Sequence, residues 1–548
     1  MRRNVYVGSA WPYPNGKLHL GHIAGLVPAD VIARYHRLRG DRVLWTSGSD
    51  CHGTPITERA RKEGVAPRDV AGRFHAGFIR TFDRLGFSYD LYGATMEPWH
   101  VQAVQESFLE LHRKRLIVEG EELAAHCDAC RDRRADREIG GTCPACHSAG
   151  ARGDQCDACG RVLAPNELLS PVCRACGGAI RFERSRELFF DLPAFEPLLR
   201  DWVGRQSHWR VNAKGWTDGW LKEGLKRRTV TRAIDWGIPV PLPGWEDRRI
   251  YVWFEAVHGY LTASREWARR QGDPDAWKPF WTMTDPRALA YYVVGKDNIP
   301  FHTLLWPAVL MGLGLALPWQ IVSSEYLTFG DAKLSKSTGT AITADKALDA
   351  YDPDALRWFL VAHGPERQDT PFTWERFVSV ANADLANTYS NLVHRLLSFV
   401  ARTYGGCLPD AKPFGERADA LLEMVDRSFD EIGTLIERTE LREAAARVLA
   451  LAQVTNEFVS HEAPWVQIRT NASRAASAVS VALRVIAALA VLTQPFMPFQ
   501  AQRLARLLAP AAADGEAAFS RWEAPTLKPG VRLAPPEPLF LRISAPSA

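Results

Sequence analysis

The sequence has little net charge, no low-complexity segment and no hydrophobic run that could cross a membrane without interruption. Its 67 Lys and Arg residues nearly balance 63 Asp and Glu residues, which leaves a formal net charge of +4. Any nucleic-acid partner must therefore be bound by a local patch rather than by a global field. Residues 304–322 and 478–499 approach the length of about 20 apolar residues that a span needs, but prolines and polar residues interrupt both. We expect no membrane association.

The first residues also lack the apolar stretch and small-residue cleavage site of a secretory signal, so we expect a cytoplasmic protein. The composition, 46% hydrophobic and 24% charged, is that of an ordinary globular protein. At 548 residues the chain is longer than one hydrophobic core usually supports, which predicts several domains.

Cysteine is concentrated in one segment. Eight of the ten cysteines form four Cys-x-x-Cys pairs, whereas Cys51 and Cys407 stand apart as ordinary thiols. The spacing is typical of zinc knuckles, because each pair supplies two thiolates and two pairs complete a tetrahedral site. The compact central block and the two pairs outside it predict these ligand sets: Cys143, Cys146, Cys156 and Cys159 for one zinc, and Cys127, Cys130, Cys173 and Cys176 for a second. Such sites leave no position for water, so we expect one or two structural Zn²⁺ ions rather than a catalytic one.

Two motifs that lie far apart in the chain predict a nucleotide-phosphate site. An apolar strand over residues 5–7 leads into a Pro/Gly turn and a helix that begins near His19. Backbone N–H groups and the imidazoles of His19 and His22 would then face one anion. The segment 333–337 offers Lys333 and Lys336 to the same phosphates. Either motif alone is common in surface turns and solvated loops, so the prediction depends on the ordered pair.

The pattern of apolar runs predicts the fold. Strand-like and helical patterns alternate over residues 4–115, and strand-like runs resume at 250–254 and 291–294. This alternation predicts an α/β fold with a doubly wound, Rossmann-type parallel sheet, whose ligands bind at the carboxyl ends of strands from both halves. From about residue 376, Ala, Leu, Arg and Glu at helical spacing predict an α-helical bundle.

We expect the following division into domains. A catalytic Rossmann domain is formed in two halves (1–115 and 187–320) around a zinc-binding insertion (116–186). A segment with the lysine loop follows (321–375), then the helical domain (376–522) and a tail that packs back on the body (523–548). The expected anchor of this tail is Leu539, Phe540 and Leu541.

Together the two phosphate motifs resemble the HIGH and KMSKS signatures of class I aminoacyl-tRNA synthetases. Over nearly its whole length the chain is similar to the methionyl-tRNA synthetase family, because further motifs follow in that family's order. These are Asp50-Cys-His-Gly-Thr-Pro-Ile, the zinc knuckles, Val252-Trp-Phe-Glu-Ala, Gly295-Lys-Asp and Ala463-Pro-Trp. The resemblance implies ATP-dependent attachment of L-methionine to methionine tRNA through methionyl-adenylate, with release of AMP and pyrophosphate. It also implies that ATP brings Mg²⁺.

The resemblance implies roles for individual residues as well. The phosphates of ATP would contact His19, Gly21 and His22. The departing pyrophosphate would contact Lys333 and Lys336, and the ribose would contact Asp297. The methionine pocket would consist of Tyr13, Asp50, Trp253, Ala256, Tyr260, His302 and Trp306. Aromatic walls suit a thioether, and the Asp50 carboxylate can pair with the α-ammonium group.

By the same resemblance the helical domain binds the anticodon through Asn391, Arg395 and Trp465. Amide and guanidinium donors can reach unstacked base edges, and an exposed indole offers a stacking face. The spacing of Asn387, Asn391 and Arg395 places the three on one helical face.

The length of the insertion helps to identify the amino-acid substrate. Synthetases for isoleucine, valine and leucine resemble this chain but carry a large editing domain, because one missing methylene gives only about 1–3 kcal/mol of discrimination. Residues 116–186 are too few and too rich in cysteine to form such a domain. Methionine, which is distinguished by shape and sulfur, fits better.

Several positions depart from the commonest pattern of the family: Trp11 replaces Leu, Glu255 replaces Asp, and Val257-His258 replaces Pro-Ile or Thr-Ile. Trp11 and His258 would lie near the pocket, so one alternative is a paralogue with altered amino-acid or inhibitor preference. A second alternative, a non-catalytic tRNA-binding protein, is disfavoured by the intact histidines and lysines. A third, an enzyme that gives its adenylate to another acceptor, is disfavoured by the intact anticodon residues. We expect that the additional C-terminal domain that dimerises some relatives is absent after the Pro-rich tail, and therefore that the protein is a monomer.

Overall fold

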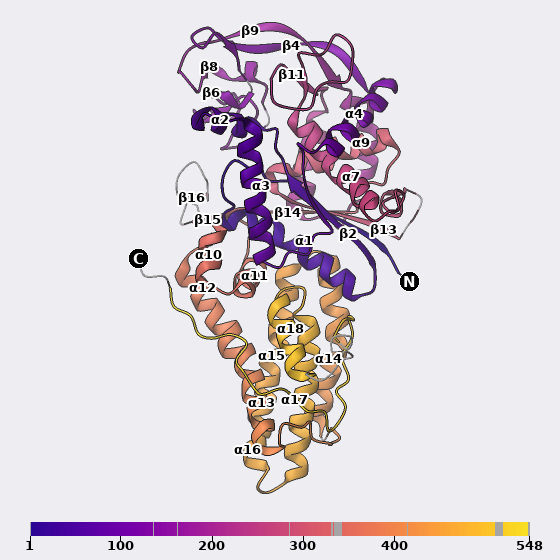
Figure 1. Cartoon of the computed structure of the whole chain (residues 1–548), viewed down its shortest axis with the longest axis vertical. Coiled ribbons are helices and arrows are strands. Elements are labelled where there is room, and N and C mark those ends of the chain that lie inside the picture. The colour runs from indigo at the N-terminus through magenta and orange to yellow at the C-terminus, as the bar shows by residue number, and fades with distance from the viewer. Residues whose placement is uncertain are drawn as a thin grey trace.

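A five-stranded parallel sheet forms the centre of the upper part of the molecule (Figure 1). The computed structural model describes residues 2–134, 136–161, 163–283, 285, 287–329, 332–333, 342–413, 415–509 and 519–545. The strands, in the order β14-β13-β1-β2-β3, are β14 (Gln320–Ser324), β13 (Ala288–Gly295), β1 (Asn4–Ser9), β2 (Arg42–Ser49) and β3 (Leu91–Ala94). The strands of the first half run to one side of β1 and those of the second half to the other. This confirms the predicted doubly wound sheet and places its switch point between β1 and β13.

Helices cover both faces of the sheet because successive strand residues point to opposite sides. Val5 and Val7 of β1 pack in one core with α1 (Leu20–Leu38) and α3 (Pro67–Arg84), whereas Tyr6 packs in a second core on the other face. The helices of that second core are α4 (Pro98–Arg113), α7 (Val252–Arg270) and α9 (Trp306–Leu313). Both faces of the central strand are therefore buried.

The strand predicted over residues 250–254 was wrong, although the one over 291–294 is confirmed within β13. Only Arg249–Ile250 is extended, as β12, and α7 begins at Val252. A short apolar run fits a buried strand or a helix equally well. Here Phe254, Val257 and Leu261 recur at helical spacing and are all buried, so helical packing decides.

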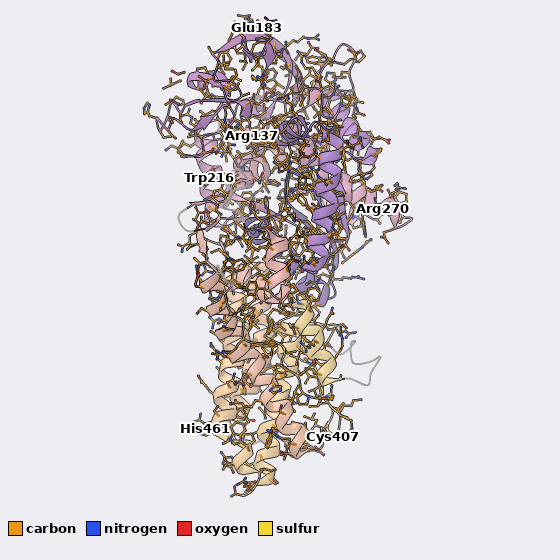
Figure 2. All side chains as sticks on the ribbon, turned by 60° about the vertical axis from the view of Figure 1, so that its left-hand side comes forward. Arg137, Glu183, Trp216, Arg270, Cys407 and His461 are labelled. Atoms are coloured by element: carbon orange, nitrogen blue, oxygen red, sulfur yellow. The ribbon has the colours of Figure 1, made fainter. Side chains whose placement is uncertain are left out.

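The cysteine-rich segment forms an antiparallel hairpin at the top of the molecule. Strand β4 (Ile117–Cys127) pairs with β9 (Ile180–Phe190) along its whole length, and Glu183 of β9 lies at the top of the view in Figure 2. A small sheet of β6 (Ile139–Thr142), β7 (Ala151–Arg152) and β8 (Leu169–Cys173) lies beside it (Figure 1). Helices α5 (Glu196–Gly204) and α6 (Val211–Glu223) then lead into the second half of the sheet.

A long helical bundle extends from the opposite side of the sheet (Figure 1). Its helices are α13 (Asn391–Thr403), α14 (Glu416–Glu437), α15 (Leu441–Glu462), α17 (Ala472–Leu492) and α18 (Pro498–Leu508), and α11 (Pro353–Ala362) joins it to the catalytic part through one continuous core. Among the described residues, α17 is the one helix long and apolar enough to span a membrane, but 83% of its apolar window is buried inside the protein. Burial of this kind is typical of a core helix.

The C-terminal tail runs back along the outside of the bundle (Figure 1). The backbone N–H of Phe540 donates to Ser390 Oγ at 3.0 Å, and the side chains of Leu539 and Phe540 are buried. Leu541, however, is 73% exposed, so the expectation that all three residues anchor the tail was wrong for this one. The chain bends at residues 539–540, and Leu541 after this bend faces solvent.

Candidate active site

Both histidines of the first motif lie at the start of α1, which begins directly after His19. The backbone N–H of His19 donates to Nδ1 of His22 at 3.1 Å, and the two rings lie 3.6 Å apart. This bond holds the His22 ring back against the end of the helix, as a capping box does. The two imidazoles therefore border the same helix terminus, where an anion is favoured.

The segment directly after the lysine loop is hydrogen-bonded to the turn that carries His19. The backbone N–H of Leu20 donates to the carbonyl of Ile342 at 3.0 Å, and that of Ala344 to the carbonyl of Leu18 at 2.9 Å. On the other side, β16 (Ala332–Lys333) pairs with β15 (Leu327–Phe329) and places the backbone of Lys333. Residues 334–341, which include Lys336, lie outside the described residues, as does the side chain of Lys333. The segment that follows the lysines is thus hydrogen-bonded to the chain on both sides of His19.

Asp297 lies where the switch point predicts a ligand group, in a short 3₁₀ turn (η4, Lys296–Asn298) directly after β13. The Tyr326 hydroxyl donates to its carboxylate. Lys296 next to it pairs with Glu325 and Asp369 at 2.8 and 2.7 Å. The Lys296 side chain is therefore held by two carboxylates, while Asp297 is exposed at the carboxyl end of β13.

Four residues of the predicted methionine pocket meet in two hydrogen-bonded pairs. The Trp253 indole N–H donates to the Tyr13 hydroxyl, and the Tyr260 hydroxyl lies 2.8 Å from Nε2 of His302. His302 Nδ1 lies 2.8 Å from the carbonyl of Asn298, which can only accept, so Nδ1 carries the proton and Nε2 accepts from Tyr260. Burial lowers the pKa of His302 to about 4, which keeps the ring neutral.

The remaining predicted pocket residues lie around these pairs. Trp306 is fully buried, with its ring 6.2 Å from that of Tyr260, and Ala256 is half-buried on the same helix as Trp253. Asp50 directly follows β2 and is 3% exposed, and its Oδ1 has no hydrogen-bond partner among the described residues. Burial, and then the nearby Glu255 carboxylate, raise the pKa of Asp50 well above its ordinary value. A buried carboxyl with a vacant acceptor is suited to a cationic ligand.

Trp11, one of the departures noted above, has an evident structural fit. A Cβ on Gly48 would lie 2.4 Å from its indole, and a Cβ on Gly259 would lie 2.7 Å from it. The larger side chain is thus accommodated because both neighbours are glycine. His258, the second departure, is buried, and its Nδ1 lies 2.7 Å from the carbonyl of Phe254. Its ring contacts Trp306 at 5.5 Å, so it is part of the packing behind the pocket.

The sequence did not indicate Arg137 as a pocket residue. It comes from a 3₁₀ turn of the cysteine-rich segment (η1, Asp136–Glu138), and its guanidinium lies 4.9 Å from the Trp253 ring centroid while it pairs with Asp154. No local pattern could place it there, because the contact joins two segments far apart in the chain. The His52–Glu255 pair, 2.7 Å apart and buried, was also missed as a contact.

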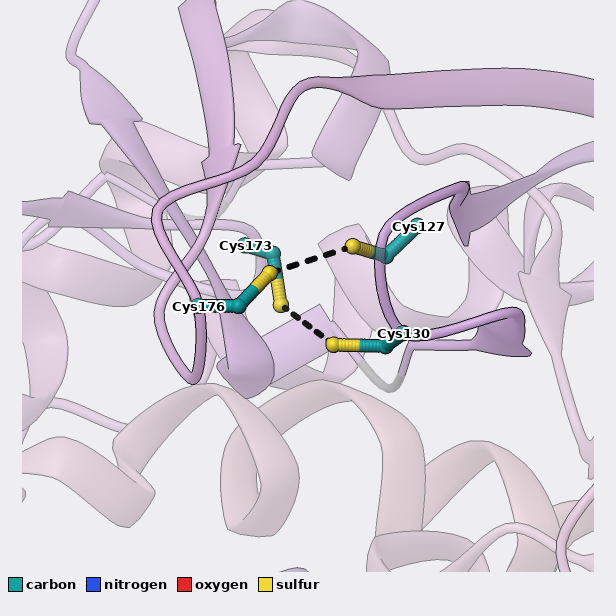
Figure 3. Close-up of side chains that lie close together, drawn as sticks. All are labelled: Cys127, Cys130, Cys173 and Cys176. Carbon is teal, nitrogen blue, oxygen red and sulfur yellow. Dashed lines mark hydrogen bonds between the residues drawn. The ribbon is translucent and has the colours of Figure 1, made fainter.

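The eight paired cysteines form two groups with the predicted membership. In each group the four sulfur atoms lie within 4.8 Å of one another. Figure 3 shows the four sulfurs of the outer group turned toward a common centre, with Cys127 and Cys176 3.4 Å apart and Cys130 and Cys173 3.9 Å apart. The backbone N–H of Cys130 points at the Cys127 sulfur and lowers the pKa of that thiol to about 7. Four converging sulfurs with a readily formed thiolate fit tetrahedral Zn²⁺.

The predicted anticodon residues gather near the far end of the bundle. Trp465 lies on a short helix, α16 (Pro464–Gln467), and is 37% exposed. The Arg395 guanidinium lies 5.1 Å from its ring centroid, and Asn391 is exposed on the same helix as Arg395. Asn387 lies in a π-helical segment (η6, Ala381–Ser390), so the regular α spacing assumed for the three does not hold across this junction.

Comparisons with known proteins identify the family of the chain. Residues 5–397 match the family model described as class I tRNA synthetases (M), and residues 408–547 match the anticodon-binding domain of methionyl tRNA ligase. The methionine–tRNA ligase of Thermomicrobium roseum is 42% identical over 572 residues, covering 99% of this chain and 97% of that protein. The methionine–tRNA ligase of Dehalococcoides mccartyi strain BAV1 is 44% identical over 545 residues, covering 99% and 98%.

A solved structure gives the same result at the level of the fold. The Mycobacterium tuberculosis methionyl-tRNA synthetase in complex with methionyl-adenylate superposes with a TM-score of 0.82 at 26% identity, covering 99% of this chain and 100% of the other. The likeness therefore extends over the sheet, the cysteine-rich segment and the bundle together.

Proposed function

This chain belongs to the class I methionyl-tRNA synthetase family, and from that premise we propose which of its residues carry out each step of the reaction. The enzyme attaches methionine to tRNA in an ATP-dependent reaction that proceeds through methionyl-adenylate. The observation that carries our assignment is the hydrogen-bonded contact between the His19 turn and the segment after the lysines, next to the buried Asp50 pocket.

In the first step a methionine carboxylate oxygen attacks the α-phosphorus of ATP, and pyrophosphate leaves with the electron pair of the broken P–O bond. Catalysis consists mainly of positioning and charge stabilisation. His19, Gly21 and His22 hold the phosphates, Lys333 and Lys336 stabilise the departing pyrophosphate, and Asp297 binds the ribose. Asp50 pairs with the α-ammonium group, and this pairing returns its carboxyl to the charged form.

The side chain of methionine lies against aromatic walls. Tyr13 and Trp253 are bonded to one another, and Tyr260 to His302, so that two rigid pairs define the pocket. Ala256 and Trp306 complete it. Thioether sulfur makes favourable contacts with such rings, worth about 0.3–1.5 kcal/mol each.

In the second step a ribose hydroxyl of the terminal adenosine of methionine tRNA attacks the activated carbonyl, and AMP leaves with the former carboxylate oxygen. We assign Asn391, Arg395 and Trp465 to the anticodon, since an amide, a guanidinium and a half-exposed indole lie together there.

Metal ions have separate tasks. Mg²⁺ accompanies ATP and offsets the charge of its phosphates. Two Zn²⁺ ions are held by the inner set Cys143, Cys146, Cys156 and Cys159 and the outer set Cys127, Cys130, Cys173 and Cys176. Because each set supplies four sulfurs, these ions are structural.

We also propose the domain division given above, with catalytic halves at 1–115 and 187–320 around the insertion 116–186, the segment 321–375, the anticodon-binding domain 376–522 and the tail 523–548. A monomer in the cytoplasm is the expected state. Sedimentation equilibrium of the purified chain and fractionation of cells that express it test these two expectations.

The decisive experiment is amino-acid-dependent ATP–pyrophosphate exchange with all twenty amino acids, followed by charging of methionine tRNA. Exchange with methionine at the highest kcat/KM, followed by charging, is the expected result. Higher efficiency with another amino acid would instead support the paralogue reading, for which the Trp11 and His258 substitutions at the pocket are the specific observations.

A further inference from the structure

Two buried carboxyl groups interact beside the methionine pocket. Asp50 directly follows β2 and is 3% exposed, and Glu255 lies in the first turn of α7 and is fully buried. Asp50 Oδ1 and Glu255 Oε2 both lack a hydrogen-bond partner among the described residues. Of the ion pairs within 4 Å that these residues form, the one that involves either carboxyl joins Glu255 to His52. A buried charge without a partner is costly, so the site cannot keep both carboxyls ionised on its own.

His52 fixes one of the two carboxyls and the segment that carries the other. Its Nδ1 lies 2.7 Å from Glu255 Oε1, and its ring packs edge-on against Trp236 with the centroids 5.0 Å apart. The Trp236 indole N–H donates to the carbonyl of Cys51 at 2.7 Å. The segment from Asp50 to His52 is therefore held from two sides, and these contacts set the position of Asp50 relative to Glu255.

The surroundings favour the charged form of Glu255 over that of Asp50. Burial raises the pKa of Glu255, but the His52 imidazole opposes this shift through its charge and its hydrogen bond. The position in the first turn of α7 also favours an anion. Burial, and then the Glu255 carboxylate, raise the pKa of Asp50 well above its ordinary value. Without a ligand, Asp50 therefore keeps its proton while Glu255 carries the charge.

The other titratable groups around these carboxyls add no balancing charge. Burial raises the pKa of Tyr13 well above its ordinary value and that of Cys51 to about 12, so both side chains stay neutral. Burial lowers the pKa of His100 well below its ordinary value, which keeps this ring neutral as well. The Arg137 guanidinium is already paired with Asp154. A positive charge for the second carboxyl must therefore come from a ligand.

We propose that Glu255 is a positioning residue that makes the pocket selective for the α-ammonium group of its amino acid. A ligand that brings one positive charge lets Asp50 ionise beside Glu255, and the proton of Asp50 passes to solvent as the ammonium group binds. A ligand without that charge leaves Asp50 protonated and meets only the negative charge of Glu255. Glu255 thus acts through Asp50. This inference rests on the proposed function, because the pairing of Asp50 with methionine is part of it.

The pH dependence of methionine binding tests the charge of Glu255. Glu255→Gln keeps the shape of the side chain and an oxygen that can accept from His52. The pH below which methionine affinity falls should move down by about one unit or more, because Asp50 no longer ionises beside a second carboxylate. Glu255→Asp retains the charge and should return this midpoint toward that of the parent. Isothermal titration of methionine over a range of pH measures the midpoint, which a purely structural role of Glu255 would leave in place.

Desaminomethionine, which lacks only the α-ammonium group, tests the selectivity. The ratio of its Kd to that of methionine should be about tenfold smaller in Glu255→Gln than in the parent, since the ammonium group then faces one carboxylate instead of two. The parent needs no substitution for a second measurement. Near the midpoint it should release a proton when methionine binds and none when desaminomethionine binds. Equal proton release with the two ligands would overturn the inference even if a variant folded poorly.

Glu266→Gln is the matched control. Glu266 lies about three turns further along α7, is also buried, and pairs with Arg269. This variant should keep the midpoint and the Kd ratio of the parent, and its Tm shows the cost of removing a buried carboxylate from this helix. A midpoint in Glu255→Gln equal to that of the parent would also overturn the inference. Undiminished methionine affinity in Asp50→Asn would instead contradict the proposed function.

Discussion

Asp50 is the residue whose surroundings most clearly decide its chemistry. Its buried carboxyl has a raised pKa, first because of burial and then because of Glu255. Below that pKa Asp50 holds a proton, which must leave before the carboxylate can pair with the α-ammonium group of methionine. Methionine affinity should therefore fall as the pH falls through the pKa of Asp50 and be constant above it, with a proton released on binding.

Isothermal titration of methionine in buffers of different ionisation enthalpy measures this proton. Asp50→Asn should abolish the release and weaken binding by about tenfold or more, because a hydrogen bond to a charged group is worth about 1.5–3 kcal/mol. Asp83→Asn, an exposed aspartate on α3, is the control and should behave like the parent. Equal proton release by the parent and Asp50→Asn would show that another group titrates.

Lys336 lies outside the described residues, but the chain that follows it is bonded beside His19 at Leu20 and Ile342. Lys336→Ala should lower the rate of adenylate formation by about 10² or more, as loss of one donor to a developing charge does elsewhere. Affinity for tRNA should barely change. ATP–pyrophosphate exchange measures the rate of adenylate formation, and a direct binding assay measures the affinity for tRNA. Lys528→Ala, at an exposed position, is the control. Full exchange activity in Lys336→Ala would exclude its role.

At the scale of elements, the two groups of four cysteines are independent units, because each closes its own set of four sulfurs. We expect two Zn²⁺ per chain by metal analysis. Cys173→Ser combined with Cys176→Ser should leave one, and the end of the β4–β9 pair at which Cys127 lies opposite Ile180 should become susceptible to proteolysis. Cys407→Ser should retain both ions, since this thiol stands outside either group. Two ions retained in the double variant would contradict the outer site.

The elements that the sequence predicted well are those with a local signal. Buried strands such as β1 and β13 are short apolar runs, α17 is a long periodic one, and cysteine spacing alone grouped the metal ligands. The predictions failed where an apolar pattern fits two kinds of element, or where a contact joins residues far apart in the sequence. The run 250–254 suits a strand or a helix, and the packing of α7 on the sheet decided it. Arg137 could not be assigned to Trp253, because only the fold brings the η1 turn (Asp136–Glu138) next to Trp253.

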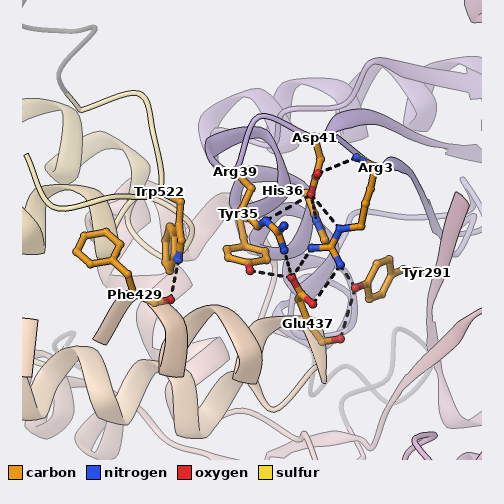
Figure 4. A network of polar contacts seen from close by, with 9 residues as sticks. All are labelled: Arg3, Tyr35, His36, Arg39, Asp41, Tyr291, Phe429, Glu437 and Trp522. Carbon is orange, nitrogen blue, oxygen red and sulfur yellow. Dashed lines mark hydrogen bonds and ion pairs between the residues drawn. The ribbon is translucent and has the colours of Figure 1, made fainter. Parts of the chain in front are cut away.

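At the scale of the whole molecule, one carboxylate joins the bundle to the sheet. Glu437 is the last residue of α14 and meets residues from the first half of the fold (Figure 4). Arg3 and Arg39 pair with it, and the Tyr35 hydroxyl donates to Oε1 at 2.9 Å. The Tyr291 hydroxyl, from β13, donates to its backbone carbonyl at 3.4 Å. The end of a bundle helix is thus fixed to the strands that carry the active site.

The contacts of Glu437 should affect the transfer of methionine to tRNA more than the formation of methionyl-adenylate. The residues that we propose for the anticodon lie at the far end of the bundle, so a small rotation at Glu437 would move the bound tRNA by a larger distance at its tip. A misplacement of about 1 Å at the reacting atoms can cost about 10²-fold in rate. Adenylate formation needs no such alignment, because methionine and ATP bind entirely within the catalytic part.

Glu437→Gln keeps the shape of the side chain and removes its charge. We expect kcat for charging to fall about tenfold or more, exchange to stay unchanged, and the unfolding free energy to fall by about 1–3 kcal/mol through weakened charged hydrogen bonds. Steady-state kinetics of both steps and urea unfolding measure these effects. Glu431→Gln, an exposed position on the same helix, is the control. If Glu437→Gln slowed both steps equally, the network would be stabilising the catalytic part itself rather than setting the angle of the bundle.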